Sequence, residues 1–196
     1  MKLLVVMLFF ASVAQAEVYK LDVAHTQVGF SVKHLMVTNV KGTFKKYTGQ
    51  FNYDSGKKEL KDIDVVIDTN SIDTGAKDRD DHLKSDDFFN AKKYSKITFK
   101  SQKVEMVPDG TSAKINGLLT IRDKTLPIVL DVTNNGEAEF MGVKKVGFTA
   151  TTKISRKDWG VAWNKSLDKG GVVVGEEVTI TIEGEANLSD GKPAKK

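Results

Sequence analysis

The sequence predicts an all-β protein, an eight-stranded antiparallel barrel with a short helical segment between two of its strands. Apolar and polar residues alternate with period two through most of the 196 residues, as they do in strands with one buried face. Glycines recur inside or beside these segments and permit the curvature that a closed barrel needs. Only the stretch from Asp78 to Phe89 interrupts the pattern with dense charge, followed by two adjacent phenylalanines.

Eight alternating segments define the predicted strands, and the first carries Val28, Phe30 and Val32 on one face. The apolar positions of the other seven are Phe44 with Phe51 and Tyr53; Ile63, Val65 and Ile67; Ile97 and Phe99 with Val104 and Met106; Ile115 to Ile121; Leu126 to Val132; Val146, Phe148, Ala150 and Ile154; and Val178, Ile180 and Ile182. Turn sequences separate several of them, at Asp54-Ser55-Gly56, Pro108-Asp109-Gly110 and Arg122-Asp123-Lys124.

Closure into a barrel is favoured over a two-sheet sandwich, the competing arrangement. A closed sheet leaves no exposed edge, and an eight-stranded barrel is wide enough to be filled by side chains or to hold one small ligand. The glycines that favour coiling and closure are Gly42, Gly49, Gly117, Gly147 and Gly184.

Charges identify the outer face of this barrel. Asp62, Asp64 and Asp68 alternate with the apolar positions of one strand, and other strands carry Lys33 or Glu183 in the same phase. A charge facing lipid costs up to roughly 2–4 kcal/mol near the bilayer midplane. We therefore expect charges to face water and apolar residues to face the interior, with no stable membrane insertion.

The charged stretch is predicted to be helical. Ser85 precedes Asp86 and Asp87, which is the pattern of a helix N-cap with acids in the first turn, so Phe88 and Phe89 are placed on a second short helix. Two adjacent aromatic rings must bury against something, and the open end of the barrel is the natural partner. A ligand lid and a surface loop with a hydrophobic plug are both compatible with this spacing.

The first residues predict export. Met1-Lys2, the apolar run Leu3 to Phe10 and Ala14-Gln15-Ala16 form a secretory signal peptide over residues 1–16, with the mature chain starting at Glu17. The expected location is the periplasm, with secretion as the alternative. Residues 17–190 are then one domain and residues 191–196 a disordered basic tail.

Composition excludes several classes of site. There is no cysteine, so disulfides, thiolate metal sites and cysteine nucleophiles are ruled out. Thirty basic residues oppose 26 acidic ones without a concentrated basic stripe, which argues against nucleic-acid binding.

Separated motifs along nearly the whole predicted mature chain are similar to those of one family. They are Tyr19-Lys20-Leu21-Asp22 with Ala24-His25-Thr26, Val28 to Leu35, Val40 to Phe44, Asp78 to Phe89, Asn116 to Ile121, Ile154 to Gly160 and Val174 to Val178. In order and spacing they resemble the YceI-like family, bacterial lipocalin-like barrels associated with polyisoprenoid binding. Thr26 stands where the family commonly has serine, and Trp159 where it often has phenylalanine.

The resemblance implies an apolar tunnel that holds a long-chain isoprenoid, isoprenoid quinone or fatty-acyl amphiphile, for transport or storage. The alternative is an enzyme or accessory factor in isoprenoid quinone metabolism that acts in the same tunnel. No cofactor is expected beyond the lipid itself, and a homodimer is a further partner to test.

Candidate site residues follow from the strand faces and the charged stretch. The expected ligand-binding residues are Val28, Phe30, Val32, Phe44, Phe88, Phe89, Phe99, Leu119, Ile121 and Phe148, joined by Trp159 and Trp163 at the tunnel mouth. The expected headgroup or rim residues are Arg79, Asp80, His82 and Arg156.

No catalytic residue is predicted, because three histidines without a nucleophile motif form no recognisable active site. No metal is predicted either. Asp78 and His82 are one helical turn apart and fit a surface pair as well as a metal site, which usually needs three or four ligands.

Overall fold

Strands make up most of the part of the chain that the computed structural model describes, residues 17–167 and 170–189. The predicted signal peptide and basic tail lie outside these residues. The strands are β1 Glu17–Leu21, β2 Gln27–His34, β3 Thr38–Phe44, β4 Tyr47–Asp54, β5 Glu59–Asp68, β6 Ile72–Asp73, β7 Lys96–Met106, β8 Ser112–Ile121, β9 Lys124–Phe140, β10 Val143–Ser155 and β11 Val174–Leu188. The helical elements are α1 Lys77–Lys84 and the 3₁₀ turns η1 Thr69–Ser71 and η2 Arg156–Trp159.

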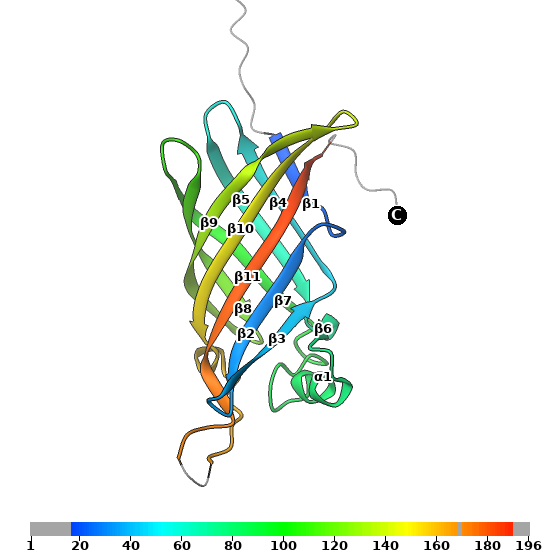
Figure 1. The fold of residues 1–196 in the computed structure, drawn as a ribbon, viewed down its shortest axis with the longest axis vertical. Coiled ribbons are helices and arrows are strands. Elements are labelled where there is room, and N and C mark those ends of the chain that lie inside the picture. Colours follow the sequence, from blue (N-terminus) through cyan, green and yellow to red (C-terminus); the bar gives the residue numbers. More distant parts are fainter. Residues whose placement is uncertain (1–16, 168–169, 190–196) are drawn as a thin grey trace, which may run out of the picture.

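Eight of these strands close an antiparallel barrel, which confirms the predicted fold class (Figure 1). Their order is β1-β4-β5-β7-β8-β9-β10-β11, and pairing of β1 with β11 closes the ring. The turn between β8 and β9 lies where it was predicted, but it is one residue shorter: it is Arg122-Asp123, with Arg122 at φ 57°, and Lys124 already belongs to β9.

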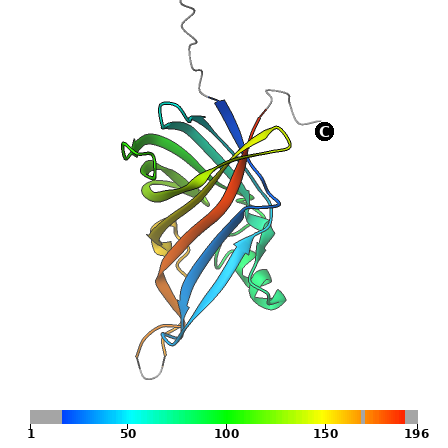
Figure 2. The same ribbon diagram turned by 45° about the horizontal axis from the view of Figure 1, so that its top comes forward.

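Along one wall of the barrel, β11 pairs with two different strands in succession. The upper part of β11 pairs with β1 at Ala186–Leu188, and its lower part pairs with β2, whose other neighbour is β3 (Figure 2). The short strand β6 extends the sheet at the edge of β3 through Phe44 and Ile72. The predicted strands did not include β1, and the one predicted strand with Phe44, Phe51 and Tyr53 is two strands, β3 and β4, separated by a turn at Lys45 and Lys46. Alternation also does not reveal the change of partner along β11.

Two of the strand glycines make room for aromatic rings inside the barrel. A Cβ atom on Gly42 would lie 2.4 Å from the Phe30 ring, and one on Gly117 would lie 2.4 Å from the Phe99 ring. Each ring therefore lies over the backbone of the neighbouring strand, where only glycine leaves space for it.

The outer face carries the charges, as the alternation predicts. Cross-strand ion pairs join Lys100 to Asp64 at 3.4 Å and Lys114 to Asp131 at 2.6 Å. Exposed pairs of this kind contribute about 0–1 kcal/mol each, so they order the surface more than they stabilise the fold. Within the described residues, none of the helices has the length and apolar character needed to cross a bilayer.

The charged stretch forms the helix α1, but the predicted second helix is wrong. Ser85 is the C-cap of α1, and its hydroxyl donates to the carbonyl of His82 at 2.8 Å. The following residues form turns whose N–H groups satisfy the end of α1, such as Phe89 N–H to the carbonyl of Leu83 at 3.1 Å. The orphan carbonyls of a helix end are thus bound by the chain that folds back with Phe88 and Phe89.

Candidate functional site

The interior of the barrel holds a cavity of about 240 Å³ whose wall is formed almost entirely by carbon atoms. Aliphatic and aromatic side chains from all eight barrel strands line it, together with Leu83, Phe88 and Phe89 from α1 and the turn after it. Ser112 and Asn134 line one end, and Arg156 lines the end that α1 and η2 cover.

The cavity is elongated along the barrel. On β8 its wall runs from Ser112 to Ile121, nine residue steps, or roughly 30 Å at about 3.3 Å per residue. For strands tilted by about 40° this corresponds to roughly 23 Å along the barrel axis. Such a shape suits an extended chain better than a compact molecule.

Ten of the twelve residues predicted to bind ligand lie on the cavity wall. They are Val28, Phe30, Val32, Phe44, Phe88, Phe89, Phe99, Leu119, Ile121 and Phe148. The parity of the alternation placed the eight strand residues on the inner face, and the charged stretch pointed to Phe88 and Phe89. Contact of all ten with a ligand stays a prediction.

The two tryptophans do not line the cavity, contrary to the expectation that they form its mouth. Trp159 is 3% exposed, packs in the main hydrophobic core, and donates its indole N–H to the carbonyl of Leu119 at 3.1 Å. Trp163 packs edge-on against His82 of α1, with ring centroids 4.9 Å apart, and at a tilt against Phe88, with centroids 5.3 Å apart. A buried indole needs a hydrogen-bond acceptor, and η2 brings Trp159 to one on β8.

The end of the barrel beneath α1 is closed by two segments that are distant in sequence. Phe88 is 5% exposed in the main core, and Phe89 packs edge-on against Phe44 with centroids 6.1 Å apart. Arg122 joins the segments, because its Nη1 donates to the carbonyls of Phe88 at 3.1 Å and Gly160 at 2.7 Å. The sequence identified Arg122 only as a turn residue and did not predict this linking role. Its place in the tight β8–β9 turn, at the end of the barrel, was the one feature that could have indicated it.

Three of the four predicted rim residues lie away from the cavity and hold α1 in place. Arg79 donates from Nε to the Thr74 hydroxyl at 2.7 Å and from Nη2 to the Thr74 carbonyl at 2.8 Å. Asp80 accepts from the Thr74 N–H at 2.8 Å and from its hydroxyl at 2.6 Å. His82 pairs with Asp87 at 2.9 Å rather than with Asp78, one helical turn before it. The contacts of Arg79 and Asp80 attach the helix to the chain after β6, and the His82–Asp87 pair joins it to the turn that follows.

Comparison with known proteins decides the family. The model of the YceI-like domain matches residues 19–186. The chain belongs to the YceI-like family. A relative from Staphylococcus epidermidis, a UPF0312 protein, is 32% identical over 174 residues, covering 88% of this chain and 98% of the relative. A UPF0312 protein of Vibrio cholerae is 37% identical over 158 residues, covering 76% and 79%.

Solved structures of YceI-like and related proteins share the barrel. The YceI protein of Campylobacter jejuni has a TM-score of 0.71 at 40% identity, covering 87% of this chain and 97% of that one. BcnA of Burkholderia cenocepacia has a TM-score of 0.69 at 26% identity, covering 86% and 99%. A polyisoprenoid binding domain from Saccharophagus degradans has a TM-score of 0.61 at 13% identity, covering 89% and 100%, a likeness of fold alone.

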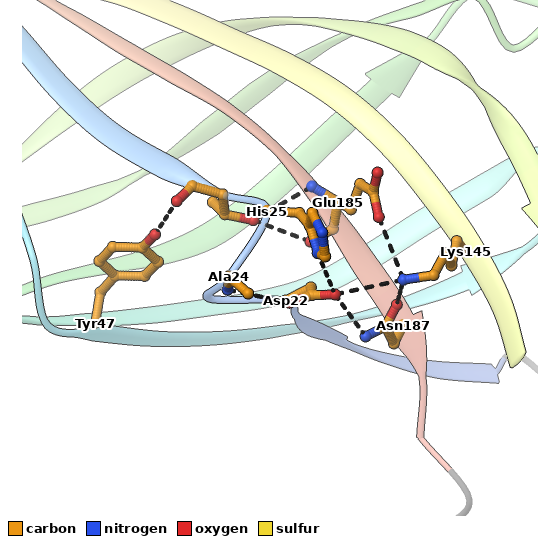
Figure 3. A network of polar contacts seen from close by, with 8 residues as sticks. Asp22, Ala24, His25, Tyr47, Lys145, Glu185 and Asn187 are labelled. Carbon is orange, nitrogen blue, oxygen red and sulfur yellow. Dashed lines mark hydrogen bonds and ion pairs between the residues drawn. The ribbon is translucent and has the colours of Figure 1, made fainter.

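The YceI-like motif around His25 forms a polar network where β1 ends and β2 begins (Figure 3). The Thr26 hydroxyl donates to the carbonyl of Glu185 at 3.0 Å, and Tyr47 donates to the carbonyl of Thr26. Hydrogen bonds from His25, then from Asn187, hold the pKa of Asp22 well below its ordinary value. The network fixes the point at which β11 changes partner, so this motif has a structural role.

The same network contains a group of possible metal ligands that the sequence pattern did not indicate. Ligand atoms of Asp22, His25 and Glu185 lie within 4.8 Å of one another. The ammonium group of Lys145 binds both carboxylates, at 3.3 Å to Asp22 and 3.2 Å to Glu185. A lysine cation thus already offsets part of their charge. The prediction that no metal is required stays a prediction.

Proposed function

We propose that this YceI-like protein binds one long-chain amphiphile in the barrel cavity, an isoprenoid, an isoprenoid quinone or a fatty-acyl lipid. The observation that carries the proposal is the elongated cavity with an almost wholly apolar wall. In a site of this kind, buried hydrocarbon supplies the affinity and a few polar groups orient the head. The domain from Saccharophagus degradans, described as polyisoprenoid binding, has the same barrel, which agrees with this use of the fold.

The length of the cavity limits what it encloses. An extended hydrocarbon advances about 1.25 Å per C–C bond, so roughly 23 Å of axis sets an upper limit of about 18 carbon atoms. Because a cavity of about 150 Å³ holds the six carbons of benzene, 240 Å³ holds about ten, and a chain near the upper limit must move wall side chains outward. At about 0.8 kcal/mol per buried methylene the gross gain reaches about 14 kcal/mol, from which the cost of association of about 4–15 kcal/mol is subtracted. Chains near this length are therefore the ones bound best, and longer isoprenoids must fold back or protrude.

The polar groups on the wall support a carrier rather than an enzyme. Among the lining residues that the structure describes, the ionisable side chains are Tyr53 and Arg156. Tyr53 lies near the end of β4, and Arg156 is the first residue of η2. These two elements end and begin at opposite ends of the barrel. No nucleophile and base adjoin each other there, and such a pair is what covalent catalysis requires. Transport or storage in the periplasm is the role we propose.

Two measurements test the proposal. Native mass spectrometry and organic extraction of protein purified from its own host should yield about one lipid per chain. With the delipidated protein, a series of saturated fatty acids should bind about four times more tightly per added methylene and level off near 18 carbons. Protein that is isolated empty and shows no dependence on chain length would contradict the proposal and favour a core filled by its own side chains.

A further inference from the structure

Arg156 is the only charged residue among the described residues that line the cavity. It is 6% exposed, although arginine is almost never fully buried unless it is paired. No ion pair joins it to a carboxylate within the described part of the chain. A cation thus lies at the wall of a hydrocarbon cavity without a counter-ion.

Backbone carbonyls hold its guanidinium group rigidly. Nε donates to the carbonyl of Gly175 at 2.8 Å, and Nη1 donates to those of Val161 at 2.6 Å and Trp163 at 3.0 Å. Nη2 donates to the carbonyl of Val174 at 3.1 Å. A guanidinium has five N–H donors, so these four bonds leave one N–H on Nη2 without an acceptor among them.

Glu176 acts on Arg156 electrostatically but does not form an ion pair with it. Burial lowers the pKa of Arg156, and Glu176 opposes the shift only through space. The Glu176 carboxylate is instead bound to Lys157 at 2.8 Å and accepts from the Ser155 hydroxyl at 3.1 Å. Arginine stays protonated in proteins, so Arg156 is a fixed positive charge inside the barrel. An anion placed beside it would offset the cost of burying the charge.

We propose that the cavity selects amphiphiles with an anionic head, a carboxylate, and binds them with the head at Arg156 and the tail toward Ser112 and Asn134. A carboxylate is favoured over a phosphate because its single negative charge matches the single positive charge of Arg156, and one of its oxygens can accept the free N–H. A phosphate has more oxygens and charge than this site has donors. The inference deepens the proposed function and rests on it.

Ligands that differ only in the head test this selection on the unmodified protein. At neutral pH, palmitic acid should bind about 10- to 100-fold more tightly than cetyl alcohol, the alcohol of the same chain length, as expected for a hydrogen bond to a charged group. Equal affinities would overturn the head selection while leaving lipid binding intact. If neither ligand binds, the proposed function fails, and this inference fails with it.

A second readout avoids any variant that might not fold. In carbon-13 NMR of bound palmitic acid labelled at the carboxyl, the carboxyl should titrate at or below its ordinary pKa, because a fixed cation stabilises the anion. A bound carboxyl whose pKa rises by several units would place the head in hydrocarbon, away from Arg156.

Two variants then distinguish the effect of Arg156 from the effect of other positive charges at this end of the barrel. Arg156→Gln should remove the preference for the acid over the alcohol. Lys157→Gln, its exposed neighbour outside the cavity wall, should leave the preference unchanged. Loss of the preference in both variants would contradict a specific role for Arg156. If Arg156→Gln does not fold, the alcohol comparison and the carboxyl titration still decide.

Discussion

Filling the cavity at Ala150 should abolish lipid binding without unfolding the protein. Ala150 is 5% exposed and lies on the cavity wall, midway between the lining residues Val146 and Ile154 of β10. A cavity of about 150 Å³ lined by apolar side chains holds a benzene molecule. The ring introduced by Ala150→Phe would therefore take more than half of the 240 Å³ cavity.

The loss of affinity follows from the length of chain that is excluded. A ring at the midpoint leaves space for about half of an 18-carbon chain, and losing nine methylenes sets an upper limit near 7 kcal/mol. Even four excluded methylenes cost about 3 kcal/mol, a Kd weakened more than about 100-fold. Because the ring enters existing space, the stability change should stay below the ~1–3 kcal/mol typical of overpacking.

Titration with a fluorescent long-chain fatty acid measures the affinity, and calorimetry measures Tm. The matched control is Thr151→Phe, the next residue on β10, which lies outside the cavity lining. It should bind as the unmodified protein does. If the Ala150→Phe variant folds and keeps its Kd within a factor of about three, the cavity is not where the lipid binds, and the reasoning from its volume is wrong.

Three further predictions follow from the structure. Phe88→Ala should cost about 3–5 kcal/mol of stability because the ring is buried in the core, whereas Phe89→Ala should cost less and speed ligand dissociation; equal stability losses with unchanged off-rates would show that neither ring is a lid. Burial, with Glu17 beside Tyr19 and Glu137 beside Tyr53, raises the pKa of both phenols to about 12. Since the unfolded value is about 10, their stabilisation is present below pH 10 and lost as pH rises through 12. Burial also raises the pKa of Tyr47, so three of the four tyrosines should ionise late in an ultraviolet titration; all four ionising together near 10 would refute this. Chelator treatment should leave Tm and lipid retention unchanged, and a chelator-dependent fall in either would establish a metal site.

Local pattern alone was sufficient for the faces of most strands, but it missed β1 and joined β3 and β4 into one predicted strand. Alternation with period two is a property of neighbouring residues, so it is enough to place Val28, Phe30 and Val32 on the inner face of the barrel. The helix at Lys77–Lys84 was recognisable for the same reason, since its charges break that period. What failed locally was Ser85, which fits an N-cap by type but caps the end of α1, because burial of Phe88 and Phe89 turns the chain back.

The sequence by itself determined the strand faces, the outward charges and the family, because these depend on residue type, period and motif order. Only the tertiary structure decided which residues meet across long separations. It placed Trp159 in the core on a carbonyl of β8 and made Arg122 the link between the turn at Phe88 and the loop at Gly160. It also buried Arg156 at the cavity wall. Such contacts depend on strand order and register, which bring together residues that no local period relates.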